Sequence, residues 1–358
     1  MKITQLHAFL VRVPQKPPVA PYQSRYRATS EKEAVIIRLE ADTGHVGWGE
    51  TPVDWIGRSF TGAPEDQLRA QAVGRDPFDL EAWYAENTLG PFLASGVEMA
   101  MWDLIGQATR QPLCKLLGGA VRTRVELAAC MGIRPYDEAK AIARHYLDAG
   151  FTTLKTKAGR APDEDLAMVR GIRDGVGDRL KLRIDPNQGY APEVAFALAR
   201  DLEPYHLEYF EQPMPQALLG EAARLRRRTR TPIALNESVT TPEVVLQILQ
   251  LGAADVLLPD TYQCGGILGV KKVAALAEAA GVPCVFHCAH DLGLKTAAML
   301  HVVASSPGFC LANDCTYYGL ADDIINPMHR VEGGFLAVPD GPGLGVRVDE
   351  AKLARYRA

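Results

Sequence analysis

From about Val125 onward, short apolar runs alternate with longer stretches whose apolar residues recur at helical spacing. Each apolar run ends in polar residues, and several lack the alternation of a half-exposed strand, as expected of parallel strands covered on both faces. Proline near the start and glycine just past the end delimit many of the helical stretches. The eight strand candidates are VELAACM, FTTLKTK, LKLRID, LEYFEQP, PIALNE, DVLLPD, PCVFHC and FCLANDC.

Eight strand–helix units of roughly 25 to 30 residues match a (β/α)8 barrel, which typically takes about 250 residues. We therefore predict an α/β fold built on a (β/α)8-type barrel or its (β/α)7β variant. An open doubly wound sheet is the alternative, but it usually has fewer strands and a glycine-rich nucleotide fingerprint after the first strand. The sequence contains neither GxGxxG nor GxxxxGK[ST].

The first 120 residues have a different pattern. The runs KITQLHAFLVRV, EAVIIRLEAD and HVGWGE indicate an antiparallel meander, and a largely helical stretch follows from about Pro64 to Leu117. Strands followed by helices favour a separate α+β domain. The predicted division is an α+β capping domain over residues 1–120, a catalytic barrel over 121–322, and a turn-rich C-terminal segment over 323–358 that returns to the capping domain.

The composition narrows the classes of function. The chain has 358 residues and a formal net charge of −4, which gives no general attraction to nucleic acid or to an anionic membrane. It has no apolar run of transmembrane length, and its N-terminus lacks the pattern of a signal peptide. Seven cysteines without a CxxC pair favour reduced thiols in a cytoplasmic protein. We expect no nucleic-acid partner, no membrane contact and a cytoplasmic location.

Ionisable or metal-binding side chains mark the carboxyl ends of the predicted barrel strands, where barrel enzymes place their active sites. They recur at intervals of about 24 to 28 residues, the length of one strand–helix unit. These strand-end residues are Lys157, Asp185, Glu211, Asn236, Asp260, His287 and Asp314. Groups at the same height on successive strands predict one active site at the mouth of the barrel.

Three neighbouring strands offer oxygen ligands for a metal: Asp185, Glu211, and either Asn236 or Glu237. A set of hard oxygens without thiolate or histidine favours Mg²⁺ over Zn²⁺. The alternative, in which each acid caps the next helix or pairs with an arginine, explains one acid more readily than three in succession. We predict a Mg²⁺ site with positions left for substrate or water.

Two lysines, Lys155 and Lys157, share one face of the second strand because side chains alternate along a strand. Two buried ammonium groups side by side are costly, so we expect an anion in front of them, such as a substrate carboxylate held on the metal. A lysine crowded by a second cation and by Mg²⁺ is expected to have a lowered pKa. Such a lysine can act as a general base near pH 7.

On the opposite side of the predicted mouth, Asp260 and His287 end strands six and seven. An aspartate hydrogen-bonded to one imidazole nitrogen fixes the tautomer and raises the basicity of the other nitrogen. His290 is a competitor for this role, but His287 lies nearer the strand end. We therefore expect Asp260 and His287 to act together.

These features resemble the enolase superfamily, in its mandelate racemase and muconate-lactonising branch. The resemblance covers nearly the whole chain and rests on SGVEMAMWDLIGQ, PLCKLLGG, the KTK strand, DPNQGY, YFEQP and PDGPGLGV. It implies that Lys157 is an acid/base group flanked by Lys155. It also implies that Asp185, Glu211 and a third-strand residue bind Mg²⁺, and that Asn187 contacts substrate.

Two details of the resemblance bear on the reaction. The stretch FHCAHDLGLKTAAMLHVVAS is similar to glucarate dehydratases, whose first histidine is catalytic, and Gln263 stands near where dipeptide-epimerising relatives carry a second lysine. Glucarate dehydratase relatives have asparagine as the third ligand and mandelate racemase relatives have glutamate. We therefore favour Asn236 slightly and keep Glu237 open.

The resemblance also implies that the capping domain recognises the distal part of the substrate. Tyr22, Arg25 and Trp55 lie in polar, turn-rich parts of this domain, where an arginine can pair with a second substrate carboxylate. The alternative is a surface loop without a role in binding. We add Asp314, at the last strand end, to the expected substrate-binding residues.

The expected activity is Mg²⁺-dependent removal of the α-proton of a carboxylate substrate through an enediolate. The pattern is most similar to acid-sugar dehydratases, so dehydration to a 2-keto-3-deoxy acid is the first hypothesis. A racemase or epimerase of a 2-hydroxy acid or related carboxylate needs the same residues, and a catalytically silent binding barrel is a third hypothesis. The expected partner is a small-molecule carboxylate, and the resemblance implies a homo-oligomer.

Overall fold

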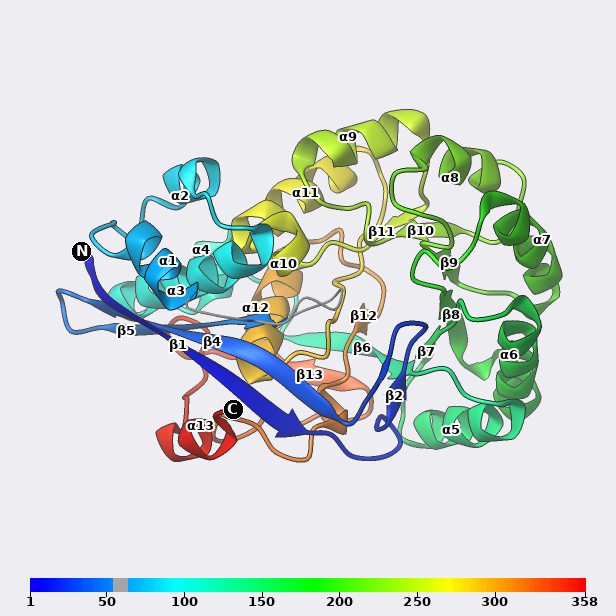
Figure 1. The fold of residues 1–358 in the computed structure, drawn as a ribbon, viewed down its shortest axis with the longest axis horizontal. Coiled ribbons are helices and arrows are strands. Elements are labelled where there is room, and N and C mark those ends of the chain that lie inside the picture. Colours follow the sequence, from blue (N-terminus) through cyan, green and yellow to red (C-terminus); the bar gives the residue numbers. More distant parts are fainter. Residues whose placement is uncertain (54–63) are drawn as a thin grey trace.

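The computed structural model describes residues 1–53 and 64–358. Trp55, one of the predicted substrate-binding residues, lies outside the described residues. The described chain forms an antiparallel sheet with helices at its N-terminal end, beside a barrel of parallel strands (Figure 1). Within these residues, no helix is both long enough and apolar enough to cross a membrane.

The barrel strands follow one another in the order predicted from the sequence. Strands β6 to β11 pair in parallel in chain order, and β12 pairs with β6. They are β6 (Arg124–Met131), β7 (Thr153–Lys157), β8 (Lys181–Asp185), β9 (Tyr209–Glu211), β10 (Ile233–Leu235), β11 (Val256–Leu257) and β12 (Asn313–Asp314).

The segment 284–287 occupies the remaining strand position and closes the barrel. The backbone N–H of Val285 donates to the carbonyl of Leu257 at 3.0 Å, and that of Asp314 donates to the carbonyl of Phe286 at 3.1 Å. This segment therefore lies between β11 and β12, where the sequence places the seventh strand. The predicted barrel is confirmed.

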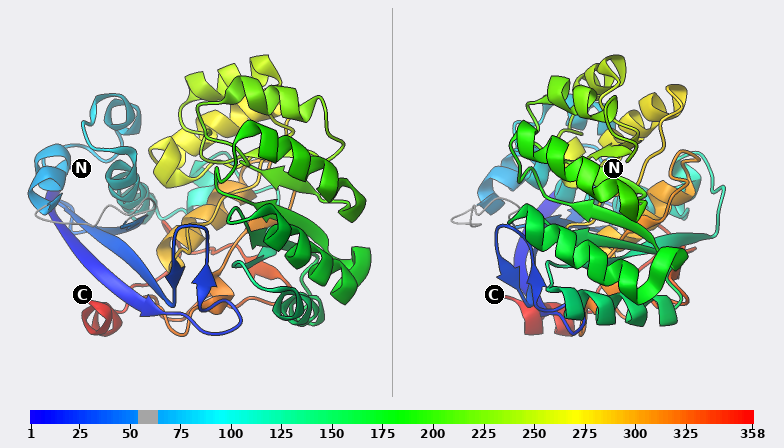
Figure 2. Two further views of the ribbon diagram at one scale, coloured as in Figure 1. Left: turned by 45° about the vertical axis from the view of Figure 1, so that its right-hand side comes forward. Right: turned by 90° about the vertical axis from the view of Figure 1, so that its right-hand side faces the viewer.

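Seven helices of the described chain cover the outside of the barrel, one in each connection between successive strand positions (Figure 2). After β12 the described chain enters the C-terminal segment without an eighth barrel helix, so the barrel is of the (β/α)7β type. The helices are α5 (Tyr136–Asp148), α6 (Pro162–Val176), α7 (Pro192–Leu202), α8 (Leu219–Arg226), α9 (Pro242–Leu251), α11 (Ile267–Ala279) and α12 (Gly293–Ala304).

Local sequence explains where these helices begin and end. In α9, the Thr241 side chain accepts from the N–H of Val244, Pro242 occupies the first helical position, and Gly252 ends the helix with a φ of 62°. The buried residues of an amphipathic helix recur at helical spacing along one face. In α5, the buried residues are Ala139, Ala143 and Tyr146.

The N-terminal domain is a three-stranded antiparallel sheet packed against helices. The strands pair in the order β1 (Ile3–Pro14), β4 (Glu31–Ala41) and β5 (Val46–Pro52), and the long helix α3 (Pro91–Thr109) lies against β5. A Cβ at Gly49 would lie 2.0 Å from a carbonyl oxygen of α3, so glycine is required for this close approach. The shorter helices are α1 (Pro64–Ala72), α2 (Leu80–Glu86) and α4 (Leu113–Leu116).

A small hairpin connects this domain to the barrel mouth. Its strands are β2 (Tyr22–Gln23) and β3 (Ala28–Thr29). The carbonyl of Gln23 accepts from the N–H of Ile133, just beyond the end of β6, at 2.7 Å. The hairpin therefore lies over the ends of the barrel strands (Figure 1).

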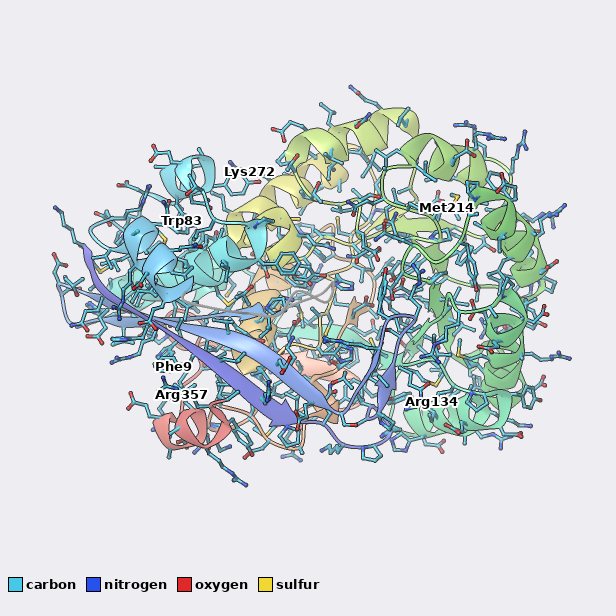
Figure 3. The ribbon with its side chains drawn as sticks, viewed as in Figure 1. Phe9, Trp83, Arg134, Met214, Lys272 and Arg357 are labelled. Atoms are coloured by element: carbon cyan, nitrogen blue, oxygen red, sulfur yellow. The ribbon has the colours of Figure 1, made fainter. Side chains whose placement is uncertain are left out.

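The C-terminal segment contacts both parts of the molecule. Strand β13 (Phe335–Ala337) pairs antiparallel with β6, and α13 (Glu350–Tyr356) lies against β1. The Arg357 guanidinium stands 5.4 Å from the centre of the Phe9 ring (Figure 3). On the other side of the N-terminal domain, Lys272 of α11 reaches Glu81 of α2 at 2.6 Å (Figure 3). The domain boundaries predicted above stay a prediction.

A buried carboxylate ties α3 to the barrel. Glu98 accepts from the backbone N–H groups of Ile267 (2.8 Å) and Leu268 (2.9 Å) at the start of α11, and from Trp102 Nε1 at 2.8 Å. An anion at a helix N-terminus satisfies N–H groups that have no partner within the helix. Glu98, which belongs to the N-terminal domain, thus caps a helix of the barrel.

This carboxylate predicts a specific pH dependence of stability. Burial raises the pKa of Glu98 from 4.5 to about 7, although the three donors act against the shift. The folded chain keeps this proton to higher pH than the unfolded chain does. The stability that the proton contributes is therefore complete below about pH 4.5 and is lost as the pH rises through about 7.

The wild type is thus expected to lose stability relative to Glu98→Gln between about pH 5 and about pH 8, because the amide does not titrate. Urea unfolding at several pH values measures this difference in the free energy of unfolding. Glu193→Gln, at an exposed position of α7, serves as the control that leaves the pH dependence unchanged. Parallel curves for the wild type and Glu98→Gln would contradict the prediction.

Candidate active site

Strand β7 carries two lysines that reach the same carboxylate oxygen. Lys155 Nζ lies 3.5 Å from Asp185 Oδ2, and Lys157 Nζ donates a hydrogen bond to that oxygen. Both lysine side chains are buried. Their common direction is the one that strand alternation predicts, and the anions in front of them include carboxylates of the protein itself.

Lys155 joins carboxylates from three other strands. Its ammonium lies 2.7 Å from Glu211 Oε1 and 2.7 Å from Asp314 Oδ2, in addition to its contact with Asp185. Burial acts to lower the pKa of Lys155, but Asp314, Glu211 and Asp185 outweigh it and hold this pKa well above its usual value. These carboxylates favour the charged form of Lys155, and the expectation that a second cation and Mg²⁺ together lower a lysine pKa stays a prediction.

One group of side chains has the spacing of a metal site but already contains a cation. Among the described residues, ligand atoms of Glu211, His287 and Asp314 lie within 4.8 Å of one another. The Lys155 ammonium bridges the two carboxylates of this group. Of the two carboxylate oxygens of Glu211, Oε1 is therefore already paired with Lys155, and Oε2 is the oxygen left for a metal.

Three buried oxygens at the ends of β9 and β10 accept no hydrogen bond from the described residues. They are Glu211 Oε2, Asn236 Oδ1 and Glu237 Oε2. A buried acceptor without a partner costs about 1–3 kcal/mol, so each of these oxygens is available to a cation or to a hydrogen-bond donor. The donor set, carboxylate and amide oxygens from neighbouring strands, fits Mg²⁺.

The orientation of the Asn236 amide is fixed. Its Nδ2 donates to the carbonyl of Leu258 at 2.9 Å and to Gln263 Oε1 at 3.2 Å. Because the nitrogen needs these two acceptors, the amide cannot turn its oxygen toward them. Asn236 Oδ1 is therefore kept on the side away from Leu258 and Gln263, where it can serve as a ligand.

Asn187 brings Asp185 and Glu237 together. Its Nδ2 donates to Asp185 Oδ2 at 3.2 Å and to Glu237 Oε1 at 3.3 Å, and its backbone N–H donates to Asp185 Oδ1 at 2.8 Å. Burial, followed by the charge of Asp185, raises the pKa of Glu237 to about 7. Carboxylates held this close together repel each other unless a cation lies between them.

His287 and Asp260 form the predicted pair. His287 Nδ1 lies 3.1 Å from Asp260 Oδ2, and both side chains are completely buried. Burial, together with Lys155 and Lys157, holds the pKa of His287 well below its usual range, so the imidazole is neutral. Around the barrel, His287 is separated from β7 by β12 and β6, so the histidine and the lysines approach the mouth from different sides.

A cavity of about 430 Å³ opens between the hairpin and the barrel mouth. Lys157 and Asn187 line it from the barrel, and Tyr22 lines it from the hairpin. Arg25 is instead engaged with the backbone of Asn187, whose carbonyl accepts from Arg25 Nη1 at 3.1 Å. Of the predicted site residues in the described chain, the lining thus includes Tyr22, Lys157 and Asn187, whereas His287 is not part of it.

Profiles of known protein families match both parts of the chain. Residues 7–118 match the mandelate racemase / muconate lactonizing enzyme N-terminal domain, and residues 138–352 match the enolase C-terminal domain-like family. The chain belongs to the mandelate racemase and muconate lactonizing branch of the enolase superfamily. Sites of this superfamily combine a lysine or histidine base with Mg²⁺.

Similar members of this superfamily catalyse different reactions. The chain is 32% identical to an L-Ala-D/L-Glu epimerase of Bacillus subtilis, over 97% of each chain. It is 28% identical to an arabinonate dehydratase of Saccharolobus solfataricus, over 91% of each. The solved structure of a dipeptide epimerase from Enterococcus faecalis, in complex with Mg and a dipeptide, has a TM-score of 0.88 and 26% identity, and covers 97% of this chain and 99% of that chain.

Several residues that lie near the site in this chain were given no role from the sequence. His290 lines the cavity, with its ring centre 4.0 Å from that of Tyr22 and its Nδ1 3.2 Å from Gln15 Nε2. Lys32 of β4 also lines the cavity. Lys295 contacts Asp260, the partner of His287, and is the one lysine in the largely apolar helix α12, a signal that sequence inspection can find.

Proposed function

We propose that this chain is a Mg²⁺-dependent enzyme that removes the α-proton of a carboxylate substrate and dehydrates an acid sugar to a 2-keto-3-deoxy acid. One observation carries the proposal. Two groups capable of acid/base chemistry, Lys157 and His287, lie at separate positions around the barrel mouth, and this mouth also holds buried oxygens without hydrogen-bond partners among the described residues. Abstraction of a weakly acidic α-proton needs both a base and stabilisation of the resulting charge.

In this proposal, Asp185, Glu211 and one oxygen from Asn236 or Glu237 hold Mg²⁺. The unpartnered oxygens Glu211 Oε2, Asn236 Oδ1 and Glu237 Oε2 support this assignment. When bound, Mg²⁺ would supply positive charge that stabilises the negative charge developing on the substrate carboxylate.

The chain's own residues would move the protons. Lys157 and His287 would lie on opposite sides of the substrate α-carbon, and one of them would remove its proton. Lys155, fixed as a cation by Glu211 and Asp314, would add positive charge beside the substrate carboxylate. In dehydration, the second acid/base group would protonate the departing β-hydroxyl, which leaves as water, and the resulting enol would tautomerise to the 2-keto acid.

Four hydroxyl-bearing residues of the described chain line the cavity: Tyr22, Ser24, Tyr26 and Thr29. The hydroxyls of Ser24, Tyr26 and Thr29 already donate to backbone carbonyls, so toward a substrate they would act as acceptors. Hydroxyl groups both donate and accept hydrogen bonds, as the hydroxyls of a sugar do.

Asn187 and Asp314 would complete substrate binding at the barrel mouth. Asp314 would act beside Lys155, which it contacts. Tyr22 would contact the distal part of the substrate from the hairpin, because it lines the cavity. Arg25 would act by holding the loop of Asn187, to whose carbonyl it donates.

Epimerisation is the second candidate, and the 32% identity to an L-Ala-D/L-Glu epimerase favours it. Both reactions begin with the same proton abstraction and differ in where the second proton is delivered. A catalytically silent binding barrel is the third candidate.

A single incubation distinguishes these candidates. The protein is mixed with aldonic and aldaric acids, Mg²⁺ and semicarbazide in D₂O. Dehydration is expected to give a 2-keto-acid semicarbazone for at least one acid. Deuterium exchange at the α-carbon without keto-acid product would replace dehydration by epimerisation, and neither product nor exchange across the panel would favour the silent barrel.

A further inference from the structure

Lys295 is a completely buried lysine directly behind the proposed histidine base. It lies in the first turn of α12, and its ammonium contacts Asp260 Oδ1 at 2.8 Å, Asp260 Oδ2 at 3.0 Å and Asp291 Oδ1 at 2.8 Å. The ring centre of Tyr262 is 5.2 Å from it. Burying a lysine is costly unless charged partners compensate, and here two carboxylates do so.

Asp260 is shared between this lysine and the histidine. Its Oδ2 faces both Lys295 Nζ and His287 Nδ1, the latter at 3.1 Å. Burial raises the pKa of Asp260, and Lys295 acts most strongly against that rise. An ionised carboxylate can only accept a hydrogen bond, so it requires the proton on Nδ1 of the imidazole and leaves the lone pair on Nε2.

Without the lysine, the same geometry would give a different tautomer. A protonated Asp260 would become a hydrogen-bond donor to Nδ1, and the imidazole proton would then reside on Nε2. An imidazole that carries its proton on Nε2 has no lone pair on that nitrogen, so it cannot accept a proton there. The lysine therefore decides which nitrogen of His287 is basic.

Residues of the N-terminal domain fix the turn that carries Lys295. Glu50 of strand β5 accepts from the backbone N–H of Leu292 at 2.7 Å and from that of Lys295 at 2.9 Å. Lys32 Nζ donates to the carbonyl of Ala289 at 2.8 Å. Leu292 occupies the N-cap position of α12 without a side-chain cap, so the cap comes from the other domain.

We propose that Lys295 is a positioning residue for His287, acting through Asp260 to hold the imidazole with its proton on Nδ1. The consequence for catalysis rests on the proposed function, in which His287 exchanges a proton with the substrate. The geometric part of the proposal does not depend on that function. The two parts are therefore tested by separate measurements.

The tautomer is tested by NMR on the full chain labelled with ¹⁵N-histidine, in which a His287→Gln sample assigns the His287 signals. We expect the wild type to show the Nδ1–H tautomer and Lys295→Met to shift to Nε2–H. Lys295→Arg, which keeps the charge, is expected to restore the wild-type pattern. Lys271→Met is the control, because this partly buried lysine of α11 contacts Ser305 and Ser306 instead of the site.

Two results would overturn the proposal: an Nε2–H tautomer in the wild type, or an unchanged Nδ1–H tautomer in Lys295→Met. Removing the lysine leaves Asp260 and Asp291 without a counter-ion, which endangers folding. The double variant Asp291→Asn/Lys295→Met removes one of these charges and carries the same prediction. The wild-type spectrum alone decides the first of the two results.

The catalytic consequence is measured by deuterium exchange of two substrate epimers that differ at the α-carbon. Lys295→Met is expected to slow exchange of the epimer that presents its proton to His287 by about 10- to 100-fold, the size typical of groups that orient a functional histidine. Exchange of the other epimer is expected to stay within about threefold. Equal slowing of both epimers would reduce Lys295 to a structural role. A wild type that neither exchanges the α-proton nor forms keto acid overturns the proposed function and leaves the NMR result to decide the role of Lys295.

Discussion

Lys157→Met is expected to lower α-proton exchange by about 10²- to 10⁴-fold for the substrate epimer that faces the lysines, the range typical of a lost general base. The methionine side chain keeps much of the volume of lysine but carries no proton acceptor. His287→Gln is expected to cause a loss of the same size for the opposite epimer. Exchange into each epimer, followed by ¹H NMR in D₂O, measures both effects.

The pattern across the two variants matters more than either loss alone. With one base on each side of the α-carbon, each variant is expected to spare exchange of one epimer and to lose exchange of the other. Lys181→Met is the matched control, because this lysine at the start of β8 is 61% exposed and pairs with Glu208 away from the mouth. Loss of exchange for both epimers in Lys157→Met alone would indicate a single base, and unchanged exchange in both variants would remove these residues from the mechanism.

The periodic part of the fold could be predicted because one physical pattern repeats. Each barrel strand is buried on both faces and ends at the mouth, so the strand-end residues, from Lys157 to Asp314, mark every unit. The sequence did not decide whether the barrel has an eighth helix. After β12 the described chain still contains one helical stretch, α13, which packs against β1 of the N-terminal domain.

The residues of the site were predicted where strand alternation decides the direction of a side chain, as for Lys155 and Lys157. The partners of those side chains were harder to predict, because they come from segments distant in the sequence. Lys155 was expected beside a substrate carboxylate, but the structure also places carboxylates of the protein against it. Lys295 contacts Asp260 across 35 residues, and Glu50 reaches it across 245. Contacts at such separations depend on how helices and domains pack, which a local pattern does not contain.

The hairpin also shows that the sequence pattern does not predict every side-chain contact, even between neighbouring residues. Arg25 and Arg27 are two residues apart, yet Arg27 lines the cavity while Arg25 donates to the carbonyl of Asn187. Between them, Tyr26 donates to that same carbonyl at 2.9 Å. In a short, turn-rich segment, no regular period decides which side chains face the substrate.

Removal of Mg²⁺ by a chelator is expected to abolish α-proton exchange, and addition of Mg²⁺ is expected to restore it. Without a divalent cation, Lys155 alone would face the second negative charge that develops on the substrate carboxylate. Exchange measured before chelation, after it and after restoration of Mg²⁺ tests this dependence directly. Undiminished exchange in the chelated protein would contradict the proposed use of the metal.

Single substitutions then assign the ligands, with Mg²⁺ affinity measured by isothermal titration calorimetry on the unliganded protein. Asp185→Asn and Glu211→Gln are each expected to weaken binding by more than about 100-fold, because each removes a full charge from a cluster of hard ligands. Asn236→Ala is expected to weaken it by about 10-fold or more, because the fixed amide presents Oδ1 as an unpartnered acceptor. Glu237→Gln is expected to change it by less than about threefold, and the reverse order of these last two effects would make Glu237 the third ligand.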